Sequence, residues 1–271
     1  MSSFHLHQVS DSTGETVGSI ARASLVQFED VDVIEHFWPL VRTSTGVEKA
    51  LDGIAKNPGM VFYTISDDEL EKQLREGCKK LDVPVVPVLN RAVQALSKYF
   101  DQEATNQTGL QYELTEEYFE RIEAINFALA HDDGKSAWEL NEADVVVVGV
   151  SRTSKSPTCM YLAYRGLRTG NVVYIPGCDL PCDFSKFTNP LIVGLTISPE
   201  RLVQIRQSRM DGMDGNKTEG YTDIDKVTEE LKQARRFFNQ QGWKVIDVTR
   251  RSVEETAALI IKHYEMHKIK K

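Results

Sequence analysis

The sequence predicts an α/β protein with an N-terminal parallel-sheet α/β domain, residues 1–108, followed by a second α/β domain, residues 109–271. Three observations predict this fold class. Short β-branched or alternating segments alternate with longer helical segments along the chain, as in parallel sheets covered by helices. Residues 101–109 are polar and lack hydrophobic periodicity, which favours a linker. Residues 145–164 read as a buried strand, a polar loop and an apolar helix, and we expect them to organise the second domain.

The N-terminal domain is predicted to alternate strands and helices four times. Its first helix shows a clear helical period, with Val17, Ile20 and Leu25 on one face. Pro39 limits the second strand, because proline cannot donate a hydrogen bond to a neighbouring strand. The predicted strands are residues 4–9, 31–41, 60–65 and 83–89, and the predicted helices are residues 17–28, 45–55, 67–80 and 90–100.

The second domain is predicted to begin with a helix capped by Thr115, whose apolar residues recur at helical spacing. Residues 223–241 form a second amphipathic pattern, and Ser252 with Glu255 makes a capping box for a terminal helix. Residues 210–219 are rich in glycine and are predicted to be a mobile loop, which could act as a lid. The apolar residues of the first helix are Tyr118, Ile122, Ile125 and Leu129, and the remaining predicted strands are residues 145–150, 171–176, 190–196 and 243–248.

Composition excludes several classes of protein. A formal net charge of −8 disfavours a nucleic-acid-binding surface, which needs a basic excess. No apolar run approaches the roughly 20 residues of a membrane span, and the first twelve residues lack the features of a secretory signal. We therefore expect a cytoplasmic protein that binds neither nucleic acid nor membrane. The four cysteines are too few and too irregularly spaced for a disulfide framework, and Cys178 and Cys182 lack zinc-site spacing.

The loop that follows the four valines of residues 145–148 has the spacing of a nucleotide-binding P-loop. In that motif a glycine is followed, after four residues, by a second glycine, a lysine and a hydroxyl residue. Ser154 stands where the second glycine is usual. The pattern predicts a P-loop-containing α/β kinase-like domain, and the alternative is an ordinary buried strand followed by a hydroxyl-rich helix cap. The residues expected to bind nucleotide or phosphate are Gly149, Val150, Ser151, Arg152, Thr153, Ser154, Lys155 and Ser156.

The residue types in this loop suit phosphate chemistry. Gly149 permits a sharp turn, after which successive backbone N–H groups and the helix N-terminus face one concavity. Lys155 supplies a mobile positive charge to the terminal phosphates, and the Ser156 hydroxyl can ligate the Mg²⁺ that the phosphates carry. Lys155 is therefore a candidate catalytic residue, and Ser156 is the candidate metal ligand.

Four carboxylates are candidates for the proton acceptor or for a metal ligand. Asp11 lies in a hydroxyl-rich turn between strand and helix, where helix capping is the alternative role. Asp132 and Asp133 lie at a helix C-terminus, where their charge opposes the helix dipole, and a solvated helix end is the alternative. Asp179 follows the strand after the P-loop helix, where Gly, Asp and Pro are the residues of an ordinary turn, which is the alternative role.

The helix that opens at Ser198 carries Arg201, Arg206 and Arg209. Three arginines in one short helix could bind phosphate or an acidic partner. The alternative, to which we give equal weight, is that they are solvated.

Five stretches in order resemble one family, that of the bacterial pyruvate, phosphate dikinase regulatory proteins, which includes the phosphoenolpyruvate synthase regulatory proteins. They extend along the whole chain. The loop departs from the usual family pattern at Ser156, where threonine is commoner but serine keeps the hydroxyl, and at Cys159. The stretches are SDSTGET at 10–16, RIEAINFALAHDDGK at 121–135, GVSRTSKSPTCMYLA at 149–163, VGLTISPERL at 193–202 and DVTRRSVEETA at 247–257.

The resemblance implies a bifunctional enzyme. Family members phosphorylate an active-site threonine of their target with ADP, which inactivates the target and releases AMP. They also remove that phosphate with inorganic phosphate as acceptor, which forms pyrophosphate. The implied substrates and cofactors are ADP, inorganic phosphate and Mg²⁺. The implied partner is pyruvate, phosphate dikinase or phosphoenolpyruvate synthase. The amino-acid sequence of residues 153–177 resembles the dikinase branch of the family more than the synthase branch. The protein could also form a homodimer.

Two other functions remain open from the residues alone. A conventional ATP-dependent P-loop kinase or NTPase would share the loop but would turn over ATP without a protein target. A non-catalytic module that senses nucleotide or binds phosphopeptide would use the loop only as an anion nest. Nucleotide preference separates the first alternative, and phosphate transfer to a purified target separates the second.

Overall fold

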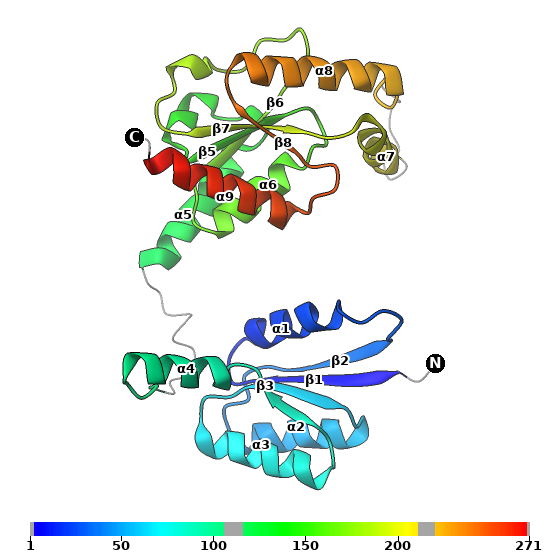
Figure 1. Ribbon diagram of the computed structural model, residues 1–271, viewed down its shortest axis with the longest axis vertical. Coiled ribbons are helices and arrows are strands. Elements are labelled where there is room, and N and C mark those ends of the chain that lie inside the picture. Colours follow the sequence, from blue (N-terminus) through cyan, green and yellow to red (C-terminus); the bar gives the residue numbers. More distant parts are fainter. Residues whose placement is uncertain (1–2, 106–115, 211–219, 270–271) are drawn as a thin grey trace. The chain divides into compact units, whose positions relative to one another are not determined.

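The computed structural model describes residues 3–105, 116–210 and 220–269, which form two compact units, Met1–Glu113 and Leu114–Lys271 (Figure 1). The predicted domain boundary between residues 108 and 109 lies outside the described residues. So does the predicted mobile loop over residues 210–219, except for Met210, which ends a helix. Each unit contains a four-stranded parallel sheet with helices on both faces. The predicted α/β class is confirmed.

The N-terminal sheet has the strand order β2-β1-β3-β4, and all its pairs are parallel. Helix α1 covers one face, while α2 and α3 cover the other (Figure 1). Thr43 and Asp67 cap α2 and α3 by accepting hydrogen bonds from backbone N–H groups of the first turn. The strands are β1 (Phe4–Ser10), β2 (Val33–Trp38), β3 (Met60–Thr64) and β4 (Val85–Pro87), and the helices are α1 (Glu15–Leu25), α2 (Ser44–Lys56), α3 (Asp68–Lys80) and α4 (Asn90–Phe100).

The second sheet has the order β6-β5-β7-β8, so its first strand in sequence again lies second in the sheet. Both units therefore share one strand order. The capping box at the start of α9 is confirmed, because Ser252 and Glu255 exchange hydrogen bonds between side chain and backbone. The strands are β5 (Val145–Gly149), β6 (Thr169–Val173), β7 (Leu191–Thr196) and β8 (Lys244–Asp247), and the helices are α5 (Glu116–Ala130), α6 (Lys155–Tyr164), α7 (Pro199–Met210), α8 (Ile224–Gln240) and α9 (Val253–Ile269).

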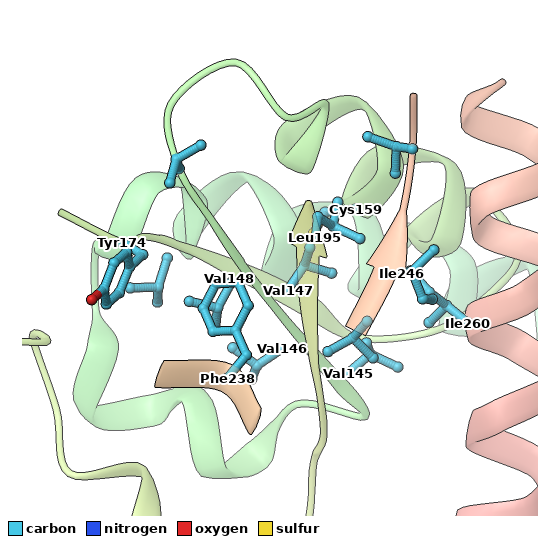
Figure 2. Close-up of a cluster of buried hydrophobic side chains, with 14 of the residues drawn as sticks. Val145, Val146, Val147, Val148, Cys159, Tyr174, Leu195, Phe238, Ile246 and Ile260 are labelled. Atoms are coloured by element: carbon cyan, nitrogen blue, oxygen red, sulfur yellow. The ribbon is translucent and has the colours of Figure 1, made fainter. Parts of the chain in front are cut away.

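The four valines of β5 are fully buried and form the centre of the second core. Figure 2 shows that Val146 and Val148 point towards Phe238 of α8, whereas Val145 and Val147 point to the opposite face, where Ile260 of α9 packs. This two-sided burial explains a continuous run of β-branched residues in place of an alternating pattern. Burying each such side chain contributes about 1.5–3 kcal/mol, so the strand that ends at the loop is firmly fixed.

The predicted helix is confirmed as α5, and its predicted cap, Thr115, lies outside the described residues. Of its four predicted apolar residues, Ile125 is partly buried against the inward alanines. Tyr118, Ile122 and Leu129 keep 36%, 40% and 59% of their surfaces exposed, and the residues that α5 buries are Ala124 and Ala128. These small residues pack with Ala163 of α6. Alanine allows two helix backbones to approach closely, which explains why the smaller side chains face inward here.

None of the described helices is long and apolar enough to cross a membrane.

Candidate active site

The loop between β5 and α6 contains two residues in the left-handed backbone region. Arg152 has φ 73° and Ser154 has φ 60°. This conformation costs a residue other than glycine about 1–2 kcal/mol, which explains why glycine is usual at the second of these positions in P-loops. Ser154 thus adopts the backbone conformation that the usual glycine would adopt.

Gly149 ends β5 in a space that no side chain could occupy. A Cβ atom there would lie 2.6 Å from the Thr153 hydroxyl oxygen and 3.1 Å from the carbonyl oxygen of Leu195. The Thr153 hydroxyl donates a 2.9 Å hydrogen bond to the carbonyl oxygen of Val150, and Thr153 is fully buried. The loop between β5 and α6 is therefore a tight turn at the carboxyl end of β5.

Lys155 begins α6 and is only 5% exposed. Its Nζ donates a 3.1 Å hydrogen bond to the carbonyl oxygen of Val150. Burial lowers the pKa of Lys155, while the charges of Asp133 and Asp132 act to raise it. A buried ammonium group at a helix N-terminus, beside a tight turn of backbone N–H groups, is chemically suited to bind phosphate oxygens.

Asp132 accepts two short hydrogen bonds at the same oxygen, Oδ1. The Ser156 hydroxyl and the Asn171 side-chain amide each donate at 2.6 Å. Burial acts to raise the pKa of Asp132, but these hydrogen bonds and the charges of Lys135 and Lys155 outweigh it and lower the pKa. Asp132 is consequently an oriented carboxylate that stays ionised at neutral pH.

Asp133 has the left-handed φ of 52°, and its backbone N–H donates a 3.2 Å hydrogen bond to Asn171 Oδ1. Its side chain is exposed, and its charge acts on Lys155. A strained residue held by its surroundings is often found at a functional site. Lys155, Ser156, Asp132 and Asp133 thus form one cluster at the carboxyl edge of the second sheet.

Ser156 and Asp132 together fit a Mg²⁺ site. Mg²⁺ in phosphate-binding sites is held by one or two protein oxygens together with phosphate oxygens and water, and this pair offers one hydroxyl and one carboxylate. No group of three or more His, Cys, Asp or Glu residues suited to a metal occurs in the described ranges. A Mg²⁺ bound here would accordingly depend on the phosphates for its remaining ligands.

The other two predicted carboxylates lie in other loops of the chain. Asp11 belongs to the N-terminal unit, where its Oδ2 accepts a 2.7 Å hydrogen bond from the backbone N–H of Ser66 and its carbonyl oxygen accepts one from Arg42. These contacts join the loop that follows β1 to the loops that follow β3 and β2. Asp179 is exposed in the loop after β6, and the pyrrolidine ring of Pro181 in the same loop lies near Gly134.

Asn171 is a site residue that the sequence did not single out. It is fully buried in β6 and contacts both Asp132 and Asp133, which lie about forty positions earlier in the chain. The available signal was its type, since asparagine is depleted from strands and a buried one requires hydrogen-bond partners.

The three arginines of α7 do not act alike. Arg206 is only 2% exposed and is paired with Glu230, whereas Arg201 and Arg209 are exposed. The guanidinium of Arg206 therefore already has a carboxylate partner. Solvation remains the simpler role for the other two.

Comparison with known proteins gives a consistent assignment. The family model described as "Kinase/pyrophosphorylase" matches residues 6–261. A relative from Caulobacter vibrioides, named as a pyruvate, phosphate dikinase regulatory protein, is 49% identical over 95% of this chain and 82% of its own length. Relatives with the same name from Paramagnetospirillum magneticum and Erythrobacter litoralis are 48% and 46% identical, over 98% of this chain and 86% and 96% of their own lengths.

A solved structure also aligns with the chain. It is a periplasmic solute-binding protein of an ABC transporter from Actinobacillus succinogenes, which covers 99% of this chain and 92% of its own. The identity is 12% and the TM-score 0.24, and a similarity this low carries no argument about fold or function.

Proposed function

This chain belongs to the kinase/pyrophosphorylase family, and we propose that it is a bifunctional serine/threonine kinase and phosphorylase that regulates pyruvate, phosphate dikinase. In the forward reaction the β-phosphoryl group of ADP passes to a threonine hydroxyl of the dikinase, and AMP and a proton are released. In the second reaction inorganic phosphate attacks the phosphothreonine, which restores the hydroxyl and forms pyrophosphate.

The observation that carries this proposal is the cluster of Lys155, Ser156, Asp132 and Asp133 beside the tight loop that starts at Gly149. Backbone N–H groups of residues 150–156 would bind the phosphate oxygens, and Arg152 would add a second positive charge. Lys155 would neutralise the charge that develops during transfer. The residues proposed to bind nucleotide or phosphate are Gly149, Val150, Ser151, Arg152, Thr153, Ser154, Lys155 and Ser156.

The two central aspartates have different proposed roles. Asp132 is oriented by Ser156 and Asn171 and has a lowered pKa, which suits a permanent anion next to Mg²⁺. Asp133 has an exposed side chain, so a protein substrate can reach it, and we assign it the role of accepting the threonine proton. Mg²⁺, when bound by Ser156 and Asp132, would neutralise charge on the phosphates.

One site can serve both reactions because both transfer a phosphoryl group between a threonine oxygen and a phosphate oxygen. A loop that holds the β-phosphate of ADP also suits free inorganic phosphate, and in the second reaction Asp133 would return a proton to the threonine oxygen. The dikinase is the proposed target because the relatives are named for its regulation, and the synthase remains the second candidate.

The proposal is tested by incubating the purified protein with Mg²⁺, ADP and each candidate target. We expect loss of dikinase activity, AMP formation and one added phosphate on an active-site threonine by mass spectrometry. Addition of inorganic phosphate without ADP should then restore activity and form pyrophosphate. ATP turnover without a protein target, or nucleotide binding without any transfer, would support one of the alternative functions instead.

Lys155→Ala tests the loop within the same assay. We expect it to reduce both reactions by at least about 100-fold, since Lys155 contributes charge stabilisation that is specific to the transferred phosphate. Lys232→Ala on α8, an exposed lysine, is the matched control and should retain full activity. Full ADP-dependent activity of Lys155→Ala would overturn the assignment of the loop.

A further inference from the structure

Arg206 is a buried charge in the middle of α7, on the side of the second unit where the phosphate-binding loop begins. Two of its guanidinium nitrogens donate to Glu230 of α8, Nη1 to Oε2 at 2.8 Å and Nη2 to Oε1 at 3.1 Å. This fork-shaped pairing neutralises the buried charge. The Arg206 side chain is 2% exposed and that of Glu230 is 22% exposed. An ion pair that is largely buried is weak support for stability, because the loss of hydration offsets most of the attraction. A contribution to stability therefore does not explain why Arg206 and Glu230 are paired here.

The same guanidinium also contacts the loop itself. Nη2 donates a 3.2 Å hydrogen bond to the carbonyl oxygen of Ser151, and Nη1 donates one of the same length to the carbonyl oxygen of Tyr221. The guanidinium carbon of Arg206 lies 4.4 Å from the centroid of the Tyr221 ring. The hydroxyl oxygen of Tyr221 is 3.3 Å from that of Ser151. Ser151 is thus held at both its backbone and its side chain.

The contact at Ser151 lies next to a strained part of the loop. Ser151 directly precedes Arg152, the first of the two residues with unfavourable left-handed φ. Such conformations persist where surrounding contacts determine them. Thr153 and Lys155 bind the carbonyl oxygen of Val150 from within the loop, whereas Arg206 binds from a neighbouring helix. The loop is therefore supported from outside at the residue before its first strained position.

We infer that Arg206, held by Glu230 and Tyr221, is a positioning residue that fixes the phosphate-binding loop at Ser151 so that the loop N–H groups are arranged before phosphate binds. The inference rests on the proposed function of the loop. Arg206 itself need not touch the phosphate, since its Nη1 and Nη2 groups donate to Glu230, Ser151 and Tyr221. Its buried Nε has no hydrogen-bond partner among the described residues. Its effect is on the geometry of the groups that do.

The test compares Arg206→Lys with Arg236→Lys, a matched substitution at an exposed arginine of α8. Lysine keeps the charge beside Glu230 but cannot reproduce the planar fork that also reaches Ser151. We expect Arg206→Lys to weaken binding of inorganic phosphate, measured by calorimetry on the full chain, by about tenfold or more, and to lower kcat by up to about 100-fold with an unchanged KM for the protein target. Arg236→Lys should match the parent protein in every measurement.

Hydrogen–deuterium exchange separates positioning from general stability. In Arg206→Lys we expect faster exchange at residues 150–156, with exchange in β7 and α9 unchanged. Glu230→Gln, which leaves the arginine in place but weakens its anchor, should show a smaller change in the same segment. Unchanged loop exchange and phosphate affinity in both variants would overturn the inference, and so would faster exchange throughout the unit.

The outcome remains informative if the proposed function fails. If the parent protein binds inorganic phosphate but phosphorylates no dikinase, the proposed target is wrong, while the phosphate affinities still test the role of Arg206. If the parent protein binds no phosphate at all, the loop assignment and the inference from it are both wrong.

Discussion

The Ser156 hydroxyl donates a 2.6 Å hydrogen bond to Oδ1 of Asp132, across twenty-four positions of the chain. The bond joins the first turn of α6 to the short 3-10 turn that follows α5. A hydroxyl and a carboxylate are thereby brought together beside the proposed phosphate-binding loop. Together they would supply the protein oxygens of the proposed Mg²⁺ site.

Asp132→Asn is expected to weaken the binding of Mg²⁺. The substitution removes the negative charge but keeps an oxygen that can accept from Ser156, so the apparent Mg²⁺ affinity should fall about 10–100-fold. The measurement is ADP-dependent transfer as a function of Mg²⁺ concentration. Asp133→Asn is the comparison, and it should lower kcat with little change in the Mg²⁺ requirement. Equal Mg²⁺ curves for Asp132→Asn and the parent protein would remove Asp132 from the metal site.

Ser154→Gly is expected to stabilise the protein. Relief of the left-handed conformation is worth about 1–2 kcal/mol, and the greater flexibility of glycine when unfolded offsets about 0.5–1 kcal/mol of it. The net gain should therefore lie between about 0 and 1.5 kcal/mol, measured by urea unfolding, with activity retained. Ser154→Val is the opposite control, because a β-branched residue fits this conformation poorly. Destabilisation by glycine would contradict the assigned backbone strain.

Gly194→Ala is expected to destabilise the second unit. The added Cβ would lie 2.4 Å from the Phe238 ring, so the core must shift at a cost of about 1–3 kcal/mol. Phe238→Leu in the same chain should recover part of that loss, and a double-mutant cycle measures the coupling. Gly46→Ala, where the nearest atom is 3.4 Å away in the first turn of α2, should be neutral or stabilising. Additive losses at Gly194 and Phe238 would contradict the predicted contact.

His7 is expected to make the N-terminal unit less stable below neutral pH. It is fully buried, with Nε2 donating to the carbonyl oxygen of Asn57 and Nδ1 accepting from Trp38, so its ring is neutral. Burial lowers the pKa of His7, and the neighbouring His36 and His5 lower it further, while the bond to Asn57 acts in the opposite direction.

A folded-state pKa below the ordinary 6.5 means that the unfolded chain binds the proton first. The stability contributed by neutral His7 is therefore complete above pH 6.5 and is lost as pH falls through the folded-state pKa. Urea unfolding between pH 8 and pH 5, followed by hydrogen–deuterium exchange in β1 and β3, measures the loss, and histidine NMR titration measures the pKa. A His7 midpoint at or above 6.5 would contradict this prediction.

Much of the fold could be predicted from the sequence, because hydrophobic periodicity and helix capping depend on residues that are close together in the chain. The valines of β5, the capping box at Ser252 and the inward face of α8 were all confirmed. The tight turn expected at Gly149 is present, whereas Lys155, expected to be a mobile charge, is buried and bonded to the carbonyl oxygen of Val150.

The contacts that complete the site could not be predicted, because they join residues far apart in the chain. Asn171 of strand β6 binds Asp132 in the turn after α5, and Arg206 of helix α7 binds Ser151 in the loop after β5. No local pattern encodes such pairs. The inward side of α5 was likewise decided by the close approach of α6, which favours Ala124 over the larger apolar residues nearby.

The parallel register of β5 has a kinetic consequence. Val145 pairs with Thr169 on one side and with Leu191 on the other, and each pairing needs a long stretch of intervening chain to close first. Such closures are slow, because the entropy of the loop is lost before the strand contacts form. Gly149, where the loop begins, pairs with Leu195 of β7. The loop is therefore stabilised by this contact only after β7 has paired with β5. We therefore expect phosphate binding to return late during refolding, after most helices have formed.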